Sequence, residues 1–365
     1  MTAPAMSADI YIHRNPAGEA AATSATGGRV VAGGADASAV IQQAVDSLPA
    51  EGGRITIAAG TWDLTSTVTV EDRHGVHLQG AARGIRGGGG TVLRSDRAID
   101  LLDISGNRIK AAGVTVSDLH LVGSGKENGR AGILVRGATD LLSLHNVGAN
   151  HCGIGFHLRG GGGERGPVVD AAQIQFCDPQ VNGVGLKIER GHYVKVVGGE
   201  FSDCGDCGIL LSSPESGYER NQGIRIVGVT GVRNGRAGIR VGRNTEDTTV
   251  TGGSDFGGTR GGSGVVVDGE GGGRDPANTI VSGVHAYNNR EAGILVRSAE
   301  QVVIQGCICS VHDHVKVDDA GQRYGIRVEA GARNVLVQGN LAYGNREQGV
   351  SDATGEAMVA GNCDS

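Results

Sequence analysis

The sequence contains few aromatic residues and no long apolar run. Phe, Trp and Tyr make up 3% of its 365 residues, fewer than a wide globular core would use. No segment approaches the roughly 20 consecutive apolar residues of a transmembrane helix. The first residues hold no basic region followed by a long apolar stretch, so no standard secretory signal is visible. We therefore expect a thin core, no membrane partner and a cytoplasmic location, with secretion still open if a leader has been trimmed from the chain.

The cysteine content does not predict a disulfide framework. The number of Cys residues is odd, seven, and several occupy slots that other repeats fill with Ala, a pattern that fits thiols kept reduced. Cys204 and Cys207 have the spacing of a redox or metal motif, but no second pair follows. We interpret both as packing residues.

Glycine, in contrast, is abundant, with 66 residues. Nine times between Gly132 and Val350 a Gly is followed by an alternating apolar segment, at intervals of 21 to 32 residues. A second alternating pair precedes the Gly in most repeats, as in 224–226 and 335–337. Two or three short strands per repeat, Gly at the bends and no helical period are typical of a parallel β-helix, which is an all-β solenoid.

An asparagine lies four residues before the Gly in three repeats, at Asn234, Asn289 and Asn345. In stacked coils these residues would lie one above another, about 4.8 Å apart. We expect each side chain to point inward and to bond the backbone of its own turn and the Asn of the next coil.

The N-terminal section differs from the repeats. Residues 36–48 place Val40, Ile41, Ala44, Val45 and Leu48 on one face of a helix, with an Asp or Ser available as its N-cap. This helix should cover the open end of the first coil, because a terminal repeat must hide an apolar face. We expect an N-terminal extension at 1–30, one β-helix domain at 31–350 that includes the capping helix, and a C-terminal tail at 351–365.

Residues 36–45, 52–64 and 76–81, together with 91–93, look like the N-terminal module of pectate-lyase-like right-handed β-helix proteins. The later coils resemble the same superfamily, so the resemblance covers roughly residues 30 to 350. It implies a right-handed parallel β-helix. The superfamily includes polysaccharide lyases, uronate epimerases, glycoside hydrolases, fructotransferases and phage tailspikes, and the fold does not select among them.

Sequence signatures that would select a branch are mostly missing. A polygalacturonase-like hydrolase would show an ordered series of Asn-Thr-Asp, Asp-Asp, Gly-His-Gly and Arg-Ile-Lys, but here only Arg108-Ile-Lys110 occurs, and it lies far too early. An alginate-epimerase-like site would carry Asp-Pro-His-Asp, whereas Asp178-Pro-Gln180 lacks the His and the second Asp. The branch therefore has to be inferred from the surface.

Side chains alternate along a strand, so if the apolar residues after each Gly point inward, those between and just beyond them point outward. Six of these outward residues are Lys or Arg, although the formal net charge of the chain is −6. The outward positions are Arg136, His157, Arg159, Lys187, Glu189, Ser212, Arg240, Asp268, Arg297, Arg327 and Glu329. Two explanations stay open: a solvated face with ion pairs between rungs, or a cleft in which Arg side chains bind sugar carboxylates or sulfates.

Long loops border this row. Segments 160–169, 213–222 and 269–278 leave the strands, and 253–263 and 312–323 enter them. Insertions on a repeat scaffold usually wall a binding face, because the coils themselves need none of them. The coils between His157 and Asp268 lie between the largest expected walls.

Two chemistries can be assigned to such a cleft. Elimination or epimerisation of a uronate needs a cation on the carboxylate, such as Arg240 or Lys187, and a proton-exchanging group, such as His157. The other expected substrate-binding residues are Arg136, Arg159, His192, Glu215, Tyr218, Arg297 and Arg327, of which His192 and Tyr218 could also exchange protons.

Hydrolysis or intramolecular glycosyl or fructosyl transfer would instead use two carboxylates, roughly 5 to 9.5 Å apart. The candidates are Glu189, Asp203, Asp206, Glu215 and Asp268. The excess of basic residues favours a lyase or epimerase acting on an acidic poly- or oligosaccharide. A non-catalytic, tailspike-like glycan-binding module is the third hypothesis.

No cofactor is required by these chemistries, and no metal site is assigned. His312 and His314, with Asp318 and Asp319, hold ligand types for a divalent ion such as Ca²⁺, but an exposed polar loop explains them as well. Carbohydrate is the expected partner, and nucleic acid is not. A homotrimer is a further expectation, because solenoids of this kind often trimerise.

Overall fold

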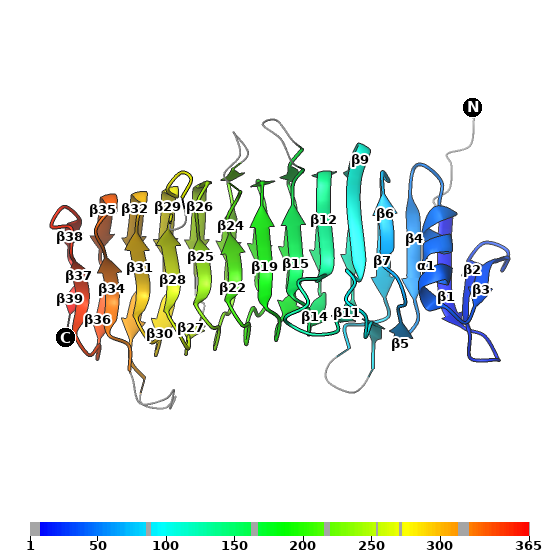
Figure 1. The fold of residues 1–365 in the computed structure, drawn as a ribbon, viewed down its shortest axis with the longest axis horizontal. Coiled ribbons are helices and arrows are strands. Elements are labelled where there is room, and N and C mark those ends of the chain that lie inside the picture. Colours follow the sequence, from blue (N-terminus) through cyan, green and yellow to red (C-terminus); the bar gives the residue numbers. More distant parts are fainter. Residues whose placement is uncertain are drawn as a thin grey trace.

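In the computed structural model the chain is an elongated solenoid of stacked parallel strands, with its ends at opposite ends of the stack (Figure 1). The structure describes residues 8–84, 89–161, 167–214, 220–252, 255–269, 272–312 and 321–364. Each coil has three faces, which we number in the order in which the chain crosses them. The expected all-β parallel β-helix with an N-terminal helix is confirmed.

Face 1 is the row of strands that crosses the front of Figure 1, and it contains the Gly-led apolar segments. Its strands are β6 (Val68–Glu71), β9 (Leu102–Ala112), β12 (Ala131–Asp140), β15 (Ile154–Arg159), β19 (Val184–Glu189), β22 (Cys207–Leu211), β25 (Ala237–Val241), β28 (Ser263–Asp268), β31 (Ala292–Arg297), β34 (Tyr324–Val328) and β37 (Gln348–Asp352).

Face 2 follows after a corner that we call corner A. Its strands are β4 (Gly53–Ile57), β7 (Val76–Gly80), β10 (Thr115–Ser117), β13 (Ser143–His145), β17 (Gln173–Gln175), β21 (Lys195–Val197), β24 (Arg225–Val227), β26 (Thr245–Thr251), β29 (Ala277–Ser282), β32 (Glu300–Gln305), β35 (Arg333–Gln338) and β38 (Met358–Ala360). Corner A itself carries the short strands β16 (Val169–Asp170), β20 (Gly191–His192) and β23 (Asn221–Gln222).

Face 3 follows after corner B and is made of two five-stranded sheets. The first contains β5 (Gly60–Asp63), β8 (Thr91–Arg94), β11 (Leu119–Val122), β14 (Gly148–Asn150) and β18 (Asp178–Pro179). The second contains β27 (Asp255–Gly257), β30 (His285–Tyr287), β33 (Ile308–Ser310), β36 (Leu341–Tyr343) and β39 (Cys363–Asp364). Corner C then returns the chain to face 1.

The core is a column of stacked aliphatic side chains, as the low aromatic content predicts. Within the described part of the chain, the fully buried large rings are Trp62, Phe156, Phe201 and Phe256. On face 1 the inward positions fall two residues apart, as with Val265 and Val267 on β28. A solenoid can be long with such a core because each coil buries its apolar side chains against its two neighbours.

The N-terminal helix α1 (Ala37–Asp46) closes the first coil at one end of the solenoid (Figure 1). Asp36 is its N-cap, and its side chain accepts a hydrogen bond of 2.9 Å from the backbone N–H of Ser38. Before it, β1 (Ala8–Arg14) pairs in parallel with β4, and β2 (Ala20–Ser24) and β3 (Val30–Gly34) extend the sheet in antiparallel fashion. The expected N-terminal extension thus contributes strands to the first coil.

At the other end, stacking continues past residue 350, the expected end of the β-helix domain. Strand β38 pairs with β35, and β39 pairs with β36. The segment expected to be a C-terminal tail therefore forms most of a last coil.

Asparagines at corner C connect successive coils. The Asn234 amide donates to the carbonyl of Phe201 at 2.9 Å and accepts from the backbone N–H of Cys204 at 3.0 Å. Asn289 bonds Phe256 and Thr259 in the same way. These side chains point inward as expected, but both bond the backbone of the preceding coil, because the parallel register places that bend directly beside the amide. Asn345 donates to the preceding coil at the Cys309 carbonyl and also, as expected, to its own turn at the Tyr343 carbonyl.

All seven cysteines are free thiols. Burial raises the pKa of the Cys152, Cys177 and Cys204 thiols to about 12, so they are protonated at neutral pH. Cys207 is also buried, as a packing role requires, but it lies in a small apolar cluster on the outer side of face 1.

Among the described residues, no helix has the length and apolar character needed to cross a membrane.

Candidate functional site: a charged outer face with an arginine pocket

Two outward rows of side chains run along face 1, each with one residue per coil. We call them row 1 and row 2. In row 1 the paired residues are Leu134, His157, Lys187, Leu210, Arg240, Val266, Leu295 and Arg327. Row 2 lies two residues further along each strand and contains Arg136, Arg159, Glu189, Ser212, Gly242, Asp268, Arg297 and Glu329.

Most of the basic side chains in these rows are paired with acids. Arg136 binds Asp103 of the preceding coil through two nitrogens, with the shortest contact at 2.7 Å. Arg327 lies 2.9 Å from Glu329. Ion pairs therefore neutralise most of the charges in rows 1 and 2, as the ion-pair explanation expects. At two places along the rows, several charged side chains meet.

The first of these places is the histidine cluster, made of His157, Lys187 and Glu189. His157 Nε2 lies 2.6 Å from one carboxylate oxygen of Glu189, and Lys187 Nζ lies 2.7 Å from the other. Burial raises the pKa of the Glu189 carboxyl, but the hydrogen bonds from His157 and Lys187 outweigh it and lower that pKa to about 2. Glu189 is therefore ionised at neutral pH and can only accept, so His157 Nε2 carries the proton of this hydrogen bond.

Arg159 lies beside the histidine cluster, since it pairs in register with Glu189. Its side chain is exposed, and within the described part of the chain it forms no ion pair or hydrogen bond. This guanidinium is available to an anionic group that comes to the surface next to His157.

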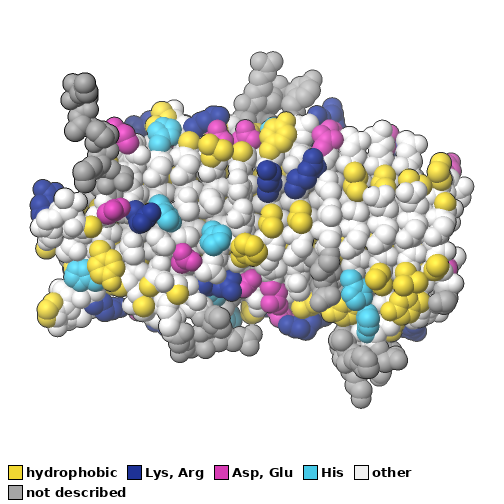
Figure 2. Space-filling model, turned by 180° about the vertical axis from the view of Figure 1, so that it is seen from behind, with side chains coloured by type: hydrophobic (Ala, Val, Ile, Leu, Met, Phe, Trp, Pro, Cys, Tyr) yellow, Lys and Arg dark blue, Asp and Glu magenta, His cyan; other side chains and the backbone are white. Residues whose placement is uncertain are grey.

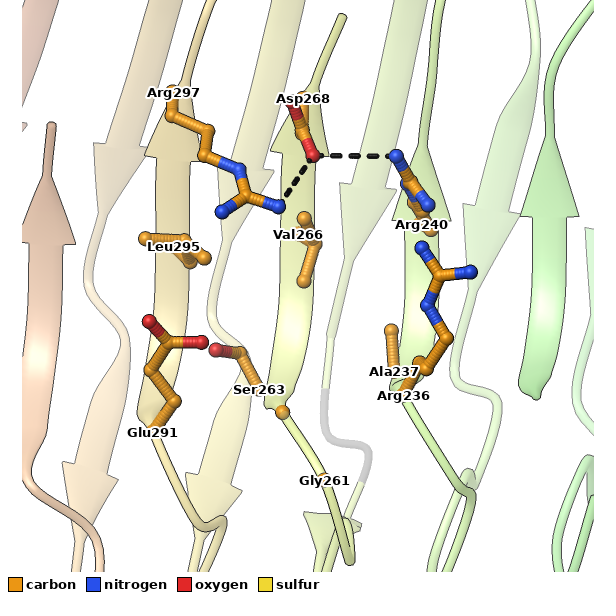
Figure 3. Close-up of a pocket in the computed structure, with 11 residues that line it drawn as sticks. Arg236, Ala237, Arg240, Gly261, Ser263, Val266, Asp268, Glu291, Leu295 and Arg297 are labelled. Atoms are coloured by element: carbon orange, nitrogen blue, oxygen red, sulfur yellow. Dashed lines mark hydrogen bonds and ion pairs between the residues drawn. The ribbon is translucent and has the colours of Figure 1, made fainter. Parts of the chain in front are cut away.

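The second place is the arginine pocket over β25, β28 and β31 (Figure 3). Asp268 lies between two arginines, with its carboxylate 3.2 Å from Arg240 and 3.0 Å from Arg297. The Asp268 side chain is only 1% exposed. A carboxylate taken out of water in this way needs its paired cations, so the three side chains form one unit.

The floor of the arginine pocket is apolar, with Val266 7% and Leu295 2% exposed. Arg236 and Glu291 line the side opposite Asp268 (Figure 3). The cavity volume is about 110 Å³. Because pockets that enclose drug-sized ligands measure roughly 300–1,000 Å³, this pocket can receive only part of a larger ligand.

Asp203 and Asp206 lie at corner C, away from rows 1 and 2. Asp203 is paired with Arg233 at 2.7 Å, and the hydrogen bond from Arg233 lowers its pKa. Asp206 lies 3.4 Å from Arg236 and so touches the rim of the arginine pocket only through that arginine.

His192 lies at corner A, where it pairs in register with Asp170 and Gln222. It is thus separated from the histidine cluster by a bend. Glu215 and Tyr218 lie outside the described residues, as do His314, Asp318 and Asp319. Parts of the expected loop walls also lie outside the described residues, namely 162–166, 215–219, 253–254, 270–271 and 313–320.

The apolar members of row 1 were not predicted from the sequence. Leu210, Val266 and Leu295 occupy outward positions that the alternation assigns to solvent, yet they pack with Ala237 and Ala292 in a second apolar cluster. The sequence signal that could have predicted them is a run of consecutive apolar residues, in which inward and outward positions are both apolar, as in Val265, Val266 and Val267 on β28. Such a continuous run indicates a strand covered on both sides.

Among the described residues, no group of three or more His, Cys, Asp or Glu side chains has a geometry that could hold a metal ion. The expected Ca²⁺ site in the 312–319 segment stays a prediction, because the structure describes only one of its candidate ligands, His312.

Comparison with known proteins gives one sequence match to a family. The model of the right-handed β-helix region matches residues 218–364. No curated protein sequence matches the chain.

Several solved structures resemble the chain at low sequence identity. The A-module of mannuronan C-5 epimerase AlgE6 from Azotobacter vinelandii is 14% identical, with a TM-score of 0.60 over 90% of this chain and 95% of that one. The catalytic unit of a GH87 α-1,3-glucanase from Streptomyces thermodiastaticus is 16% identical, with a TM-score of 0.65 over 90% and 66%. The Dettilon tailspike protein is 12% identical, with a TM-score of 0.61 over 87% and 64%.

At such identities these similarities concern the fold. The strand stacking, the family match over residues 218–364 and the structural similarity agree on the fold: the chain is a right-handed parallel β-helix, similar in fold to the epimerase module and the glucanase.

Proposed function

We propose that the chain is a carbohydrate-active enzyme that binds an acidic oligo- or polysaccharide along face 1 and acts as a lyase or epimerase. The observation that carries this proposal is the histidine cluster, in which a histidine, a lysine and an ionised carboxylate meet beside the exposed Arg159. The epimerase, glucanase and tailspike folds among the similar structures fit a carbohydrate ligand.

Elimination and epimerisation both begin with removal of the C5 proton of a uronate. Arg159 would neutralise the substrate carboxylate and make this proton more acidic. Because Nε2 of His157 carries the proton bonded to Glu189, the neutral ring has its lone pair on Nδ1, which would accept the C5 proton. Lys187 would protonate the leaving oxygen in a lyase, whereas in an epimerase the new C5 proton would come to the opposite face of the ring from a donor outside the histidine cluster.

The arginine pocket would bind a second acidic sugar of the same chain. Row 1 places Arg240 two rungs from Lys187, which is about 10 Å along the solenoid axis. The buried Asp268 holds Arg240 and Arg297 in fixed positions, and fixed guanidinium groups bind carboxylates or sulfates with little loss of side-chain freedom.

The hydrolase or transferase alternative has less support in the described residues. Glu189 and Asp268 are three rungs apart, about 14 Å at the backbone, beyond the roughly 9.5 Å of an inverting carboxylate pair. A general acid needs a raised pKa, whereas the pKa values of Glu189 and Asp203 are lowered. A pair that uses Glu215 would involve residues outside the described part of the chain.

The test is incubation of the purified chain with alginate, polygalacturonate, hyaluronan and neutral glucans. Ultraviolet absorbance of an unsaturated uronate would report a lyase, and NMR of the recovered polymer would report an epimerase. We expect the variants H157A and R159A to lose at least a hundredfold in activity, while R94A, an exposed arginine of face 3, retains it.

Products that have gained water, without ultraviolet absorbance, would replace this proposal with hydrolysis. Saturable binding without any change in the polymer would replace it with a tailspike-like binding module. Full activity of H157A would remove the histidine cluster from the mechanism.

A further inference from the structure

The corners on either side of face 2 each place one residue per coil in the left-handed backbone conformation. At corner B the ladder contains Asp118, Asn146, Phe176, Gly198, Gly228, Gly252, Gly283, Gly306, Gly339 and Gly361, all with positive φ. At corner A it contains Leu141, Ala171, Tyr193, Gly223, Asp247, Asn278, Gln301 and Asn334, again all with positive φ. Glycine, asparagine and aspartate are the residues that tolerate this conformation.

Two aromatic residues occupy these unfavourable positions on neighbouring coils. Phe176 has a φ of 52° and is 56% exposed, and Tyr193 has a φ of 52° and is 61% exposed. The chain contains only 4 Phe, 6 Tyr and 1 Trp. Large rings are therefore rare here, and two of them stand in solvent at positions where the backbone disfavours them.

Both rings are held by the next coil. A Cβ added to Gly198 would lie 3.0 Å from the Phe176 ring, and one added to Gly223 would lie 2.8 Å from the Tyr193 ring. Each ring thus leans over the glycine of the following coil. On the other side, His145 meets the Phe176 ring edge-on at 6.0 Å, and His192 meets Tyr193 at 6.4 Å. The rings have defined orientations and still present large exposed surfaces.

The surface between the two rings, on β17 and β21, presents Gln173, Gln175, Lys195 and Val197. Face 2 has two outward rows of side chains: one runs from Arg54 on β4 to Met358 on β38, and the other from Thr56 to Ala360. The structure describes every member of these two rows, and none of them is Asp or Glu. Lys195 on β21 and Arg225 on β24 are exposed there, in a chain with a formal net charge of −6. Figure 2 shows this back side of the molecule, where basic side chains lie near the middle with apolar ones close by.

We infer that face 2 is a second, non-catalytic binding surface for an acidic oligosaccharide, which crosses β17 and β21 between Phe176 and Tyr193. The C–H faces of sugar rings stack on aromatic π-faces, whose negative charge attracts them. Lys195 would bind an anionic group between the two stacked sugars. Five residues of strand and one rung separate Phe176 from Tyr193, so their backbones lie roughly 15–17 Å apart. A ligand that contacts both rings therefore spans several sugar units.

This inference rests on the proposed function for its class of ligand, but it concerns a different face, which corner A separates from the histidine cluster. The catalytic proposal is tested by turnover, and the face 2 proposal by binding and stoichiometry. A turnover assay with trisaccharides, which can occupy face 1 without reaching face 2, separates the two.

The experiment measures binding of polygalacturonate and hyaluronan oligosaccharides, with a neutral glucan as reference, by calorimetry and affinity electrophoresis. The variants are F176G, Y193G and their combination. Glycine suits the left-handed conformation, so we expect the thermal midpoint to stay or to rise. The matched control is L141G, at another exposed, apolar, left-handed position of corner A, where Leu141 is 59% exposed.

We expect the double variant to bind the acidic oligosaccharides at least tenfold more weakly and to lose one of two sites per chain. L141G should bind as the wild type does, and turnover of trisaccharides should not change in any of these variants. Unchanged affinity and stoichiometry in the double variant would overturn the inference. So would a wild-type chain that binds none of the acidic probes, or that binds the neutral glucan equally well.

Discussion

At the scale of single residues, the carboxylates of face 1 serve to hold cations in place. Glu189 fixes His157 and Lys187, and Asp268 fixes Arg240 and Arg297. A carboxylate with several donors stays ionised, so it can orient a neighbouring base but cannot donate a proton at neutral pH. This favours a mechanism in which histidine and lysine side chains, and not carboxylates, accept and donate the protons.

Replacement of Glu189 by glutamine should reveal this role through pH. Folding lowers the pKa of Glu189 from its ordinary value of 4.5 to about 2, so the ionised group stabilises the folded state above about pH 4.5, and this stabilisation is lost as the pH falls towards 2. The corresponding free energy is roughly 3 kcal/mol at neutral pH. Urea unfolding of wild type and E189Q at pH 7, 4 and 3 should give a difference in unfolding free energy that shrinks with falling pH. A difference that is constant across this range would show that the pairing seen in the histidine cluster does not persist in solution.

The positions of these residues could be predicted only in part. The alternation of apolar residues is enough to place His157, Lys187 and Glu189 outward, because side-chain direction depends on the strand alone. It cannot predict that Asp268 is buried, since the covering arginines belong to two other coils. Coils differ in length by several residues, so which side chains meet across rungs depends on a register that only the assembled structure defines.

At the scale of the elements, each coil is tied to the preceding one by more than the strand ladders. The buried Asn234 satisfies a carbonyl and an N–H at the bend of the preceding coil. Its spacing from the following glycine is visible in the sequence, and so is its inward direction. The partner coil is not visible, because local geometry allows an Asn side chain to bond its own turn equally well.

Truncation of Asn234 to alanine should loosen the stack at corner C. The change leaves the Phe201 carbonyl and the Cys204 N–H buried without a partner, at a cost of about 1–3 kcal/mol each. Denaturant unfolding should therefore show a loss of about 2–6 kcal/mol. N107A is the control, because Asn107 is exposed and bonds Glu71 at the surface; it should change the free energy by less than about 0.5 kcal/mol. Equal effects of the two variants would contradict the bridging role.

At the scale of the whole molecule, the solenoid has no closed core, so its ends decide whether it associates end to end with other chains. Helix α1 covers the first coil with Val40, Ile41, Ala44 and Val45, all of them buried. The sequence predicts this helix almost to its bounds, because an amphipathic period, an N-cap and a position before the first repeat all agree. The strands β1 to β3 that complete the cap carry no comparable signal, since their pairing with β4 is non-local.

An acidic residue at the centre of the cap should open this end of the solenoid. Ile41 is fully buried, and the variant I41D places an unpaired carboxylate against the apolar end of the first coil. We expect the helix to detach and the exposed coil to associate with other chains, because an uncapped solenoid end presents apolar side chains and unpaired strand edges. Size-exclusion chromatography with light scattering should detect larger species, while Q43D, on the exposed side of the same helix, should elute as the wild type does. If I41D had the same mass and thermal midpoint as Q43D, α1 would be an appendage and the end of the solenoid would be protected by β1 to β3 alone.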